Sequence, residues 1–359
     1  MSASCYEGIS NRWSDEVRKS RDYKVIRNDN CYKAGFYDSF IFESEYQDIR
    51  DYIEKIKVQY EGIPFEHCFQ GDTLSTPAGM CYRIQSVEKI PQREKEQCRI
   101  KEHYLSDLTL VFGIGKKTAE VLHGKGCRSI RDLLRIRQFR EEAAWCLKII
   151  EESDPENVNL MLSKRHRSSH PYALLSSDLF TDRDTIFLDI ETLGLFSRPI
   201  ILFGIAIERE GSLLIEQYLL REIAEEPASI SAVLEFLYEK PVLVTYNGKS
   251  FDIPYIKERA SFYGFNLDIS LPHYDMLHVA RSRYKNELNN CRLSTIEREV
   301  LGIFREHDIP GVLVPELYEE FLNSGNSGLL IPLIEHNRQD LISLALLFHY
   351  IKKETYEGR

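Results

Sequence analysis

The stretch Thr185-Ile186-Phe187-Leu188-Asp189-Ile190-Glu191-Thr192 decides the fold, because it is a short apolar run that ends in two acids one residue apart. Side chains of a β-strand alternate between its two faces, so Asp189 and Glu191 are predicted to project from one face at the C-terminal end of a strand. An unpaired charge in an apolar run costs several kcal/mol. A bound cation would remove that cost, and the pair therefore indicates a cation site.

Two later stretches carry the same kind of chemistry. Val242–Thr245 is a second strand of the buried type, and it breaks at Asn247-Gly248 before a predicted helix that carries Asp252. His336 and Asp340 are separated by four positions, which places them on one face of a helix. Each of these polar side chains is thus predicted to come from a rigid element.

Four carboxylates and one histidine suit a phosphodiesterase that uses hard divalent cations. Mg²⁺ and Mn²⁺ prefer oxygen ligands, and two such ions about 3.5–4 Å apart can clamp the attacking and leaving oxygens of a phosphodiester. Imidazole titrates near neutral pH, so His336 is the candidate base. The predicted ligands of the two ions, which we also expect to be catalytic, are Asp189, Glu191, Asp252 and Asp340.

These motifs resemble those of the DEDD 3′–5′ exonucleases of the ribonuclease H-like superfamily. The closer likeness is to the YprB-type ribonuclease H-like domain, through Tyr-Asn-Gly-Lys-Ser-Phe-Asp-Ile-Pro at 246–254 and His-Asn-x-x-Asp at 336–340. The resemblance covers residues 181–352 and implies a metal-dependent 3′–5′ exonuclease in which Asn247 and Lys249 position the substrate. His336 departs from the pattern, since it lies four residues before the last Asp, where tyrosine-type members carry their tyrosine.

The elements predicted around the motifs give an α/β fold. Three strands followed by alternating helix and strand match the mixed five-stranded sheet with flanking helices of ribonuclease H-like proteins. Ligands of such sheets collect beyond the strand ends, where the acids are expected. The predicted organisation is a flexible arm (1–29), a small α+β subdomain of unknown role (30–100), a helix-hairpin-helix DNA-binding region (101–162), a linker (163–180) and the exonuclease domain (181–355).

Phe112-Gly113-Ile114-Gly115 predicts a tight hairpin, because glycines adopt backbone angles closed to other residues. From Phe112 to Arg140, eight Lys and Arg side chains stand against Glu120 and Asp132, a local charge of +6 in a chain of −10. The stretch resembles a helix-hairpin-helix element, whose backbone N–H groups bind a DNA phosphate. A helical linker with a solvated basic face is the alternative. The predicted phosphate-binding residues are Gly113, Gly115, Lys116 and Lys117.

Composition and cysteine usage narrow the class of protein. Hydrophobic content of 43% and charged content of 28% are typical of globular domains. Eight scattered cysteines without a Cys-x-x-Cys pair argue against a zinc ribbon and predict free thiols in a reducing compartment. The sequence lacks a signal-peptide core and any apolar run of membrane-spanning length, so we expect a cytoplasmic protein without a membrane partner. It gives no indication of oligomeric state.

Three functions are open on the sequence alone. The first is a 3′–5′ exonuclease, for which the hairpin region favours DNA as the substrate and partner. The second is an endonuclease that acts on RNA or an RNA–DNA hybrid, since the motifs do not distinguish a free 3′ end from an internal bond. The third is a catalytically silent DNA-binding adaptor, which the complete set of acids argues against.

Overall fold

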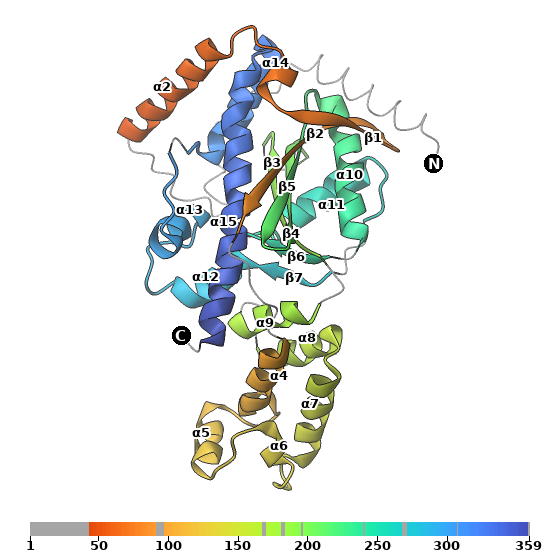
Figure 1. Cartoon of the computed structure of the whole chain (residues 1–359), viewed down its shortest axis with the longest axis vertical. Helices are drawn as coiled ribbons and strands as arrows, with labels where there is room; N and C mark the ends of the chain where they lie inside the picture. Colours follow the sequence, from red (N-terminus) through yellow and green to blue (C-terminus); the bar gives the residue numbers. More distant parts are fainter. Residues whose placement is uncertain are drawn as a thin grey trace.

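A computed structural model describes residues 43–90, 97–166, 170–180, 184–194, 197–239, 241–267, 271–306 and 308–357. The predicted flexible arm, residues 1–29, lies outside these ranges. In Figure 1 a body built on a β-sheet fills one end of the molecule, and a group of short helices forms the other end.

The sheet contains seven strands in the order β1-β2-β5-β4-β3-β6-β7. Their bounds are β1 (Gly71–Thr76), β2 (Gly79–Lys89), β3 (Thr185–Thr192), β4 (Ile200–Arg209), β5 (Ser212–Leu219), β6 (Val242–Thr245) and β7 (His273–Asp275). β6 pairs in parallel with both β3 and β7, and the other pairings are antiparallel. The α/β fold with a mixed sheet is as predicted.

The five strands predicted for residues 181–355 are present as β3 to β7, and the hairpin β1-β2 adds two more to the same sheet. β2 pairs with β5 from Tyr82↔Leu219 to Lys89↔Ser212, and this pairing satisfies backbone groups of β5 that would otherwise form a free sheet edge. The sequence separation between β2 and β5 explains why this pairing was not predicted, since no local pattern links the two strands. The predicted N-terminal subdomain therefore contributes its hairpin to the same sheet.

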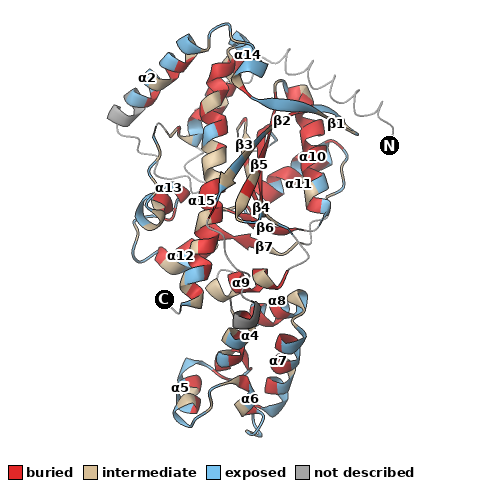
Figure 2. Ribbon diagram, viewed as in Figure 1, coloured by how far each residue is buried: buried red, intermediate tan, exposed pale blue. Residues whose placement is uncertain are grey.

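The two faces of the sheet are covered by different helices. α10 (Glu226–Tyr238) and α11 (Asp252–Phe262) pack with Ile186, Leu188 and Ile190 of β3 on one face. On the other face α15 (Ile331–Tyr356) packs against Phe187, and Figure 2 shows it largely buried where it crosses the strands. Because side chains alternate along a strand, Asp189 and Glu191 share the face of Phe187 and lie toward α15.

Further helices surround the sheet-centred body. Ile49 and Ile53 of α2 share one apolar cluster with Leu317 and Leu329, so the helix before the hairpin also packs onto this body. The bounds are α2 (Glu43–Gln59), α3 (Phe65–Cys68), α12 (Met276–Tyr284), α13 (Leu293–Ile296) and α14 (Val314–Ser324), with a π-turn η5 (Glu297–Leu301) and short 3-10 turns η4 (Ile223–Glu225), η6 (Gly311–Leu313) and η7 (Ser327–Leu330).

The helices at the other end of the molecule form what we call the helical unit, residues 97–179, with an apolar core of its own. It docks onto the C-terminal part of α15, where Asp178 accepts from the Tyr356 hydroxyl at 2.9 Å and pairs with Lys352. Its elements are α4 (Gln97–Ser106), η2 (Leu108–Leu110), α5 (Lys116–Gly124), α6 (Ile130–Leu133), α7 (Arg140–Glu152), α8 (Pro155–Ser163), α9 (Pro171–Leu175) and η3 (Ser176–Leu179).

One part of the helical unit differs from the predicted domain organisation. The predicted linker, residues 163–180, includes α9 and η3, and Leu174 and Leu175 of α9 are fully buried. Earlier in the unit, α4 ends at Ser106, and the Asp107 side chain accepts from the Thr109 N–H at 2.9 Å and caps the 3-10 turn η2.

None of the helices in the described part of the chain combines the length and apolarity needed to cross a membrane.

Candidate active site

The site is built at the C-terminal end of β3. Asp189 and Glu191 flank the buried Ile190 there and point to the α15 side of the sheet. A register shift between Glu191 and Thr192 ends the regular pairing with β4 at this point. Irregularities of this kind are common next to functional sites, because they re-aim side chains.

Asp252 reaches the same strand end from the other side of β3. It is the first residue of α11, is only 3% exposed, and its Oδ1 accepts from the Ile190 N–H at 3.2 Å. β6 runs parallel to β3, so the turn that follows β6 delivers Asp252 to the edge where β3 ends. The predicted convergence of Asp252 with Asp189 and Glu191 is therefore what the structure has.

Asp275 organises the turn before Asp252. Its carboxylate accepts from the backbone N–H of Asn247 at 2.9 Å and of Lys249 at 3.1 Å, and it also caps α12. Asn247 adopts a positive φ of 68°, a conformation that asparagine tolerates better than most residues. The predicted substrate residues Asn247 and Lys249 thus lie on a turn that Asp275 holds through two backbone hydrogen bonds, and Lys249 is exposed.

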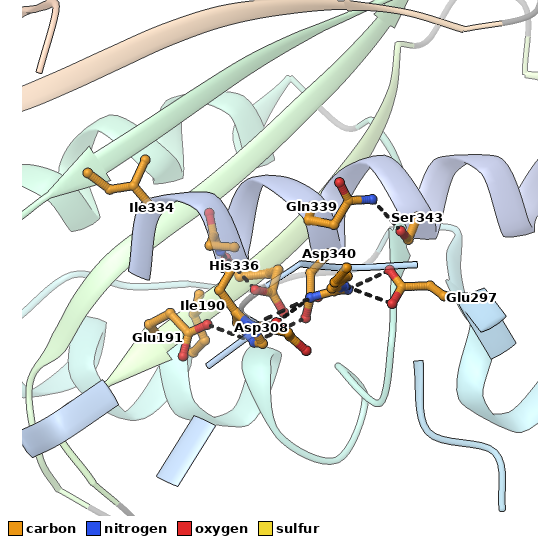
Figure 3. Close-up of polar contacts among 12 residues, drawn as sticks. Ile190, Glu191, Glu297, Asp308, Ile334, His336, Gln339, Asp340 and Ser343 are labelled. Carbon is orange, nitrogen blue, oxygen red and sulfur yellow. Dashed lines mark hydrogen bonds and ion pairs between the residues drawn. The ribbon is translucent and has the colours of Figure 1, made fainter. Parts of the chain in front are cut away.

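α15 supplies the third motif. His336 and Asp340 lie one turn apart, with His336 Nε2 3.8 Å from Asp340 Oδ2 and 3.8 Å from Glu191 Oε1. The Nδ1 atom of His336 lies 2.8 Å from Asp308 Oδ1. Figure 3 shows Glu191, Asp308, Asp340 and Glu297 gathered with His336 on one side of α15. The helical spacing predicted for this motif is confirmed.

Asn337 is a site residue to which the sequence assigns no role. Its side-chain amide is fully buried, donates to Asp189 Oδ2 at 2.8 Å and accepts from Gln217 at 2.9 Å. Asp189, Gly204 and Gln217 lie opposite one another on β3, β4 and β5. A Cβ atom on Gly204 would stand 2.2 Å from Asn337 Oδ1, so glycine is required for Asn337 to reach between its two partners.

A second unforeseen group comes from the segment that follows η5. Arg305 contacts Asp340, pairs with Glu297 and lies 3.2 Å from Asp308. Arg305 and Asp308 carry no sequence signal, because they lie on an irregular segment about thirty positions before the helix residues they contact.

Three carboxyl groups of this cluster have pKa values above their usual range. Burial and then repulsion from Asp340, Glu191 and Asp252 raise the pKa of Asp189 well above its usual range. Burial raises the pKa of Glu191 to about 7, against the effect of His336, and burial raises the pKa of Asp252 to about 7. Such shifts are typical of functional sites and mark a place where an additional cation would be stabilised.

The same acids act on His336 in the opposite direction. Burial lowers its pKa, but Asp340, the hydrogen bond to Asp308 and Glu191 together raise it to about 10. The imidazole is therefore protonated at neutral pH while these carboxylates are ionised. Compensating the negative charges of Asp340 and Glu191 would remove two causes of the raised His336 pKa. His336 can therefore act as a base only when those two charges are compensated.

The chemistry of the donor set fits Mg²⁺ or Mn²⁺, since four carboxylates converge and three have raised pKa values. Across the described residues, however, no three His, Cys, Asp or Glu side chains are arranged to hold one ion together. Asp189 is held by Asn337 and Asp340 by Arg305. Binding an ion would require at least Asp340 to change partner.

The predicted phosphate-binding residues are not part of this cluster. Gly113, with φ of +84°, turns the chain before α5, and Gly115 precedes the first residue of that helix. Lys116 and Lys117 are exposed. Phe112 is 63% exposed and lies under the guanidinium of Arg165 at 4.7 Å. The hairpin belongs to the helical unit, which docks at the other end of α15 from His336 and Asp340.

Comparison with known proteins agrees with this geometry. Residues 186–352 match a family model described as the RNase_H superfamily. Residues 186–352 form an RNase H-like domain. The match confirms the resemblance to the ribonuclease H-like superfamily and the predicted fold class. An RNase H-like domain points to a nuclease that acts on nucleic acid, and nucleases of this superfamily generally use divalent metal ions.

Two individual proteins are similar to parts of this chain. It is 36% identical over 188 residues to the Bacillus subtilis (strain 168) protein described as "Uncharacterized protein YprB", a match that covers 50% of this chain and 45% of YprB. The match thus spans less than half of YprB. A family B DNA polymerase from Pyrobaculum calidifontis aligns with a TM-score of 0.37 and 17% identity, over 46% of this chain and 24% of the polymerase. A likeness of that size adds nothing to the assignment.

Proposed function

We propose that this chain is a divalent-metal-dependent 3′–5′ exonuclease that hydrolyses phosphodiester bonds, with DNA as the favoured substrate. The proposal rests chiefly on one observation, the gathering of four acids from β3, α11 and α15 at one end of the sheet. The RNase H-like fold of the same residues supports it. The complete set of acids also separates this reading from that of a silent adaptor.

The proposed ligands of Mg²⁺ or Mn²⁺ are Asp189, Glu191, Asp252 and Asp340. When bound, such ions lower the pKa of an attacking water and stabilise charge on the leaving oxygen. Asn337 orients Asp189, and Asp308 orients His336 through Nδ1, which leaves Nε2 on the side of Glu191 and Asp340. His336 then accepts a proton once those carboxylates are neutralised.

The nuclease reading predicts a specific pattern of products. We expect labelled DNA with a free 3′ end to be shortened stepwise in Mg²⁺ or Mn²⁺ and to stay intact in EDTA, because the carboxylates alone do not activate water. A panel of single- and double-stranded DNA and RNA, with matched circular and 3′-blocked forms, measures this. Cleavage of circles would replace the exonuclease by an endonuclease. Salt-sensitive binding without any product would replace it by an adaptor.

For the helical unit we propose phosphate binding by the hairpin residues Gly113 and Gly115 and by Lys116 and Lys117. The exposed start of α5 offers backbone N–H groups that have no partner inside the helix, and a helix N-terminus favours an anion. The two lysines add charge at the same place. This part of the proposal concerns holding the substrate and not the chemistry.

Reversing both lysine charges tests the hairpin. Lys116→Glu with Lys117→Glu is expected to weaken DNA binding about tenfold at moderate salt and to reduce the slope of log affinity against log salt by about 1–2. Fluorescence anisotropy in Ca²⁺ measures both quantities. Lys148→Glu is the matched control, because Lys148 lies on α7 of the same unit and is 73% exposed. Equal affinities for the double variant and wild type would remove the hairpin from the binding surface.

A further inference from the structure

Arg305 is held beside α15 by a sharp reversal of the chain. η5 ends at Gly302, whose φ of +70° is a left-handed conformation, and the Ile303 N–H donates to the Glu297 carbonyl at 2.9 Å. The reversal returns Arg305 to Glu297, and Arg305 Nε donates to Glu297 Oε2 at 2.8 Å. Glu297 is 1% exposed, so this ion pair anchors the guanidinium from its buried side.

The other side of the guanidinium faces Asp340, a proposed metal ligand, and Asp308, the partner of His336. One terminal nitrogen contacts Asp340 Oδ1, and the other lies 3.2 Å from Asp308 Oδ1. Arginine does not lose its charge in proteins, so Arg305 is a cationic partner of Asp340 at every pH in this arrangement. A divalent cation on the same carboxylate would meet that positive charge at contact distance, and the two would compete.

The Arg305 side chain is itself 10% exposed, and the residues on both sides of it reach solvent. Phe304, the preceding residue, is 76% exposed, and Glu306 on the other side is exposed as well. A guanidinium presents a planar set of donors that matches phosphate as well as carboxylate. Arg305 could therefore turn from Asp340 to a phosphate approaching from the solvent side while Glu297 keeps its hold on Nε.

We propose that Arg305 is the resident counter-ion of Asp340 and exchanges that carboxylate for a substrate phosphate when a divalent cation binds. The inference rests on the proposed nuclease function, and it gives that site a phosphate-binding arginine. It also explains how Asp340 is stabilised at a site with several uncompensated acids.

Mn²⁺ binding without nucleic acid tests the first half of the exchange. Arg305→Gln is expected to bind Mn²⁺ about tenfold more tightly than wild type, as measured by the electron paramagnetic resonance signal of free Mn²⁺. Because Arg305→Gln leaves Glu297 buried without its partner, Glu297→Gln and the double variant Glu297→Gln/Arg305→Gln are compared in the same way. The double variant is expected to bind about tenfold more tightly than Glu297→Gln alone.

Oligonucleotide binding in Ca²⁺ tests the second half. Arg305→Gln is expected to bind a short labelled single strand about tenfold more weakly, although its metal site is stronger. Arg298→Gln is the matched control, because Arg298 pairs with Glu299 at the surface and its loss should change neither measurement. Mn²⁺ affinities that agree within twofold, in both comparisons, would make Arg305 a structural partner of Glu297 only. Tighter Mn²⁺ binding with unchanged oligonucleotide binding would reject the transfer to phosphate.

These outcomes are separable from failure of the nuclease proposal. The Mn²⁺ titration needs no turnover. An inactive protein whose Mn²⁺ affinity depends on Arg305 would therefore support the counter-ion role and reject the nuclease proposal. An active enzyme whose Mn²⁺ affinity does not depend on Arg305 would reject the counter-ion role and support the nuclease proposal.

Discussion

Asp189→Asn is expected to lower metal-dependent hydrolysis by about 10³-fold, which corresponds to roughly 4 kcal/mol of transition-state stabilisation. The amide keeps the size of the side chain and still accepts the hydrogen bond from Asn337, but it is a far weaker metal ligand. Turnover of a 3′-labelled strand in Mg²⁺ measures the effect. Asp184→Asn is the matched control, because Asp184 precedes β3 by one residue and pairs with Arg209 at the surface.

The same variant should be more stable than wild type in EDTA. Burial, and then Asp340, Glu191 and Asp252, raise the pKa of Asp189 above its usual value of 3.8, so ionised Asp189 destabilises the folded state. This cost is absent below pH 3.8, where both states are protonated, and grows as the pH rises toward the folded pKa. The melting temperature of Asp189→Asn should therefore exceed that of wild type by more at pH 8 than at pH 5. Full activity in the variant would reject Asp189 as a ligand.

Arg259→Met is expected to destabilise the α10–α11 layer by about 3–5 kcal/mol, because it leaves a buried carboxylate without its partner. Arg259 Nε donates to Glu226 Oε1 at 2.8 Å, and the two side chains are 2% and 0% exposed. Hydrogen exchange of amides in α10 and α11 measures the loss locally. We expect it to accelerate about 100- to 4,000-fold, since 1.4 kcal/mol is a factor of ten.

Two comparisons sharpen this second test. Arg259→Met/Glu226→Gln should recover much of the loss, because it removes the unpaired charge that dominates the single variant. Arg209→Met breaks the exposed pair with Asp184 and should change exchange little. If Arg259→Met exchanged at the wild-type rate, the buried pair would not hold α11. Since Asp252 is the first residue of α11, destabilising this helix should also lower metal-dependent hydrolysis.

The parts of the site that the sequence predicted follow from local geometry. Alternation along a strand is enough to put Asp189 and Glu191 on one face, and a spacing of four is enough to put His336 beside Asp340 on a helix. The parallel pairing of β3 and β6 then brings Asp252 to the same edge. The fold class was predictable for the same reason, because each motif sits at the end of a regular element.

The parts that escaped prediction depend on contacts between distant segments. Gln217 and Asn337 meet only because β5 lies two strands from β3, with Gly204 leaving room between them. Arg305 and Asp308 reach the site from an irregular segment, where periodicity carries no information. The hairpin β1-β2 has regular strands, but nothing in its sequence names β5 as the partner.

α15 sets the distance between the acidic cluster and the docking point of the helical unit. It is one unbroken helix of 26 residues, with Asp340 near one end and Lys352, which pairs with Asp178 of the helical unit, near the other. At 1.5 Å per residue those two positions stand about 18 Å apart along the axis. As long as Asp178 of the helical unit stays bound to Lys352 and Tyr356, α15 therefore fixes how far this docking point lies from the carboxylates. A polymer bound both at the carboxylates and at the helical unit would be cleaved at a constant number of units from the place where the helical unit binds it.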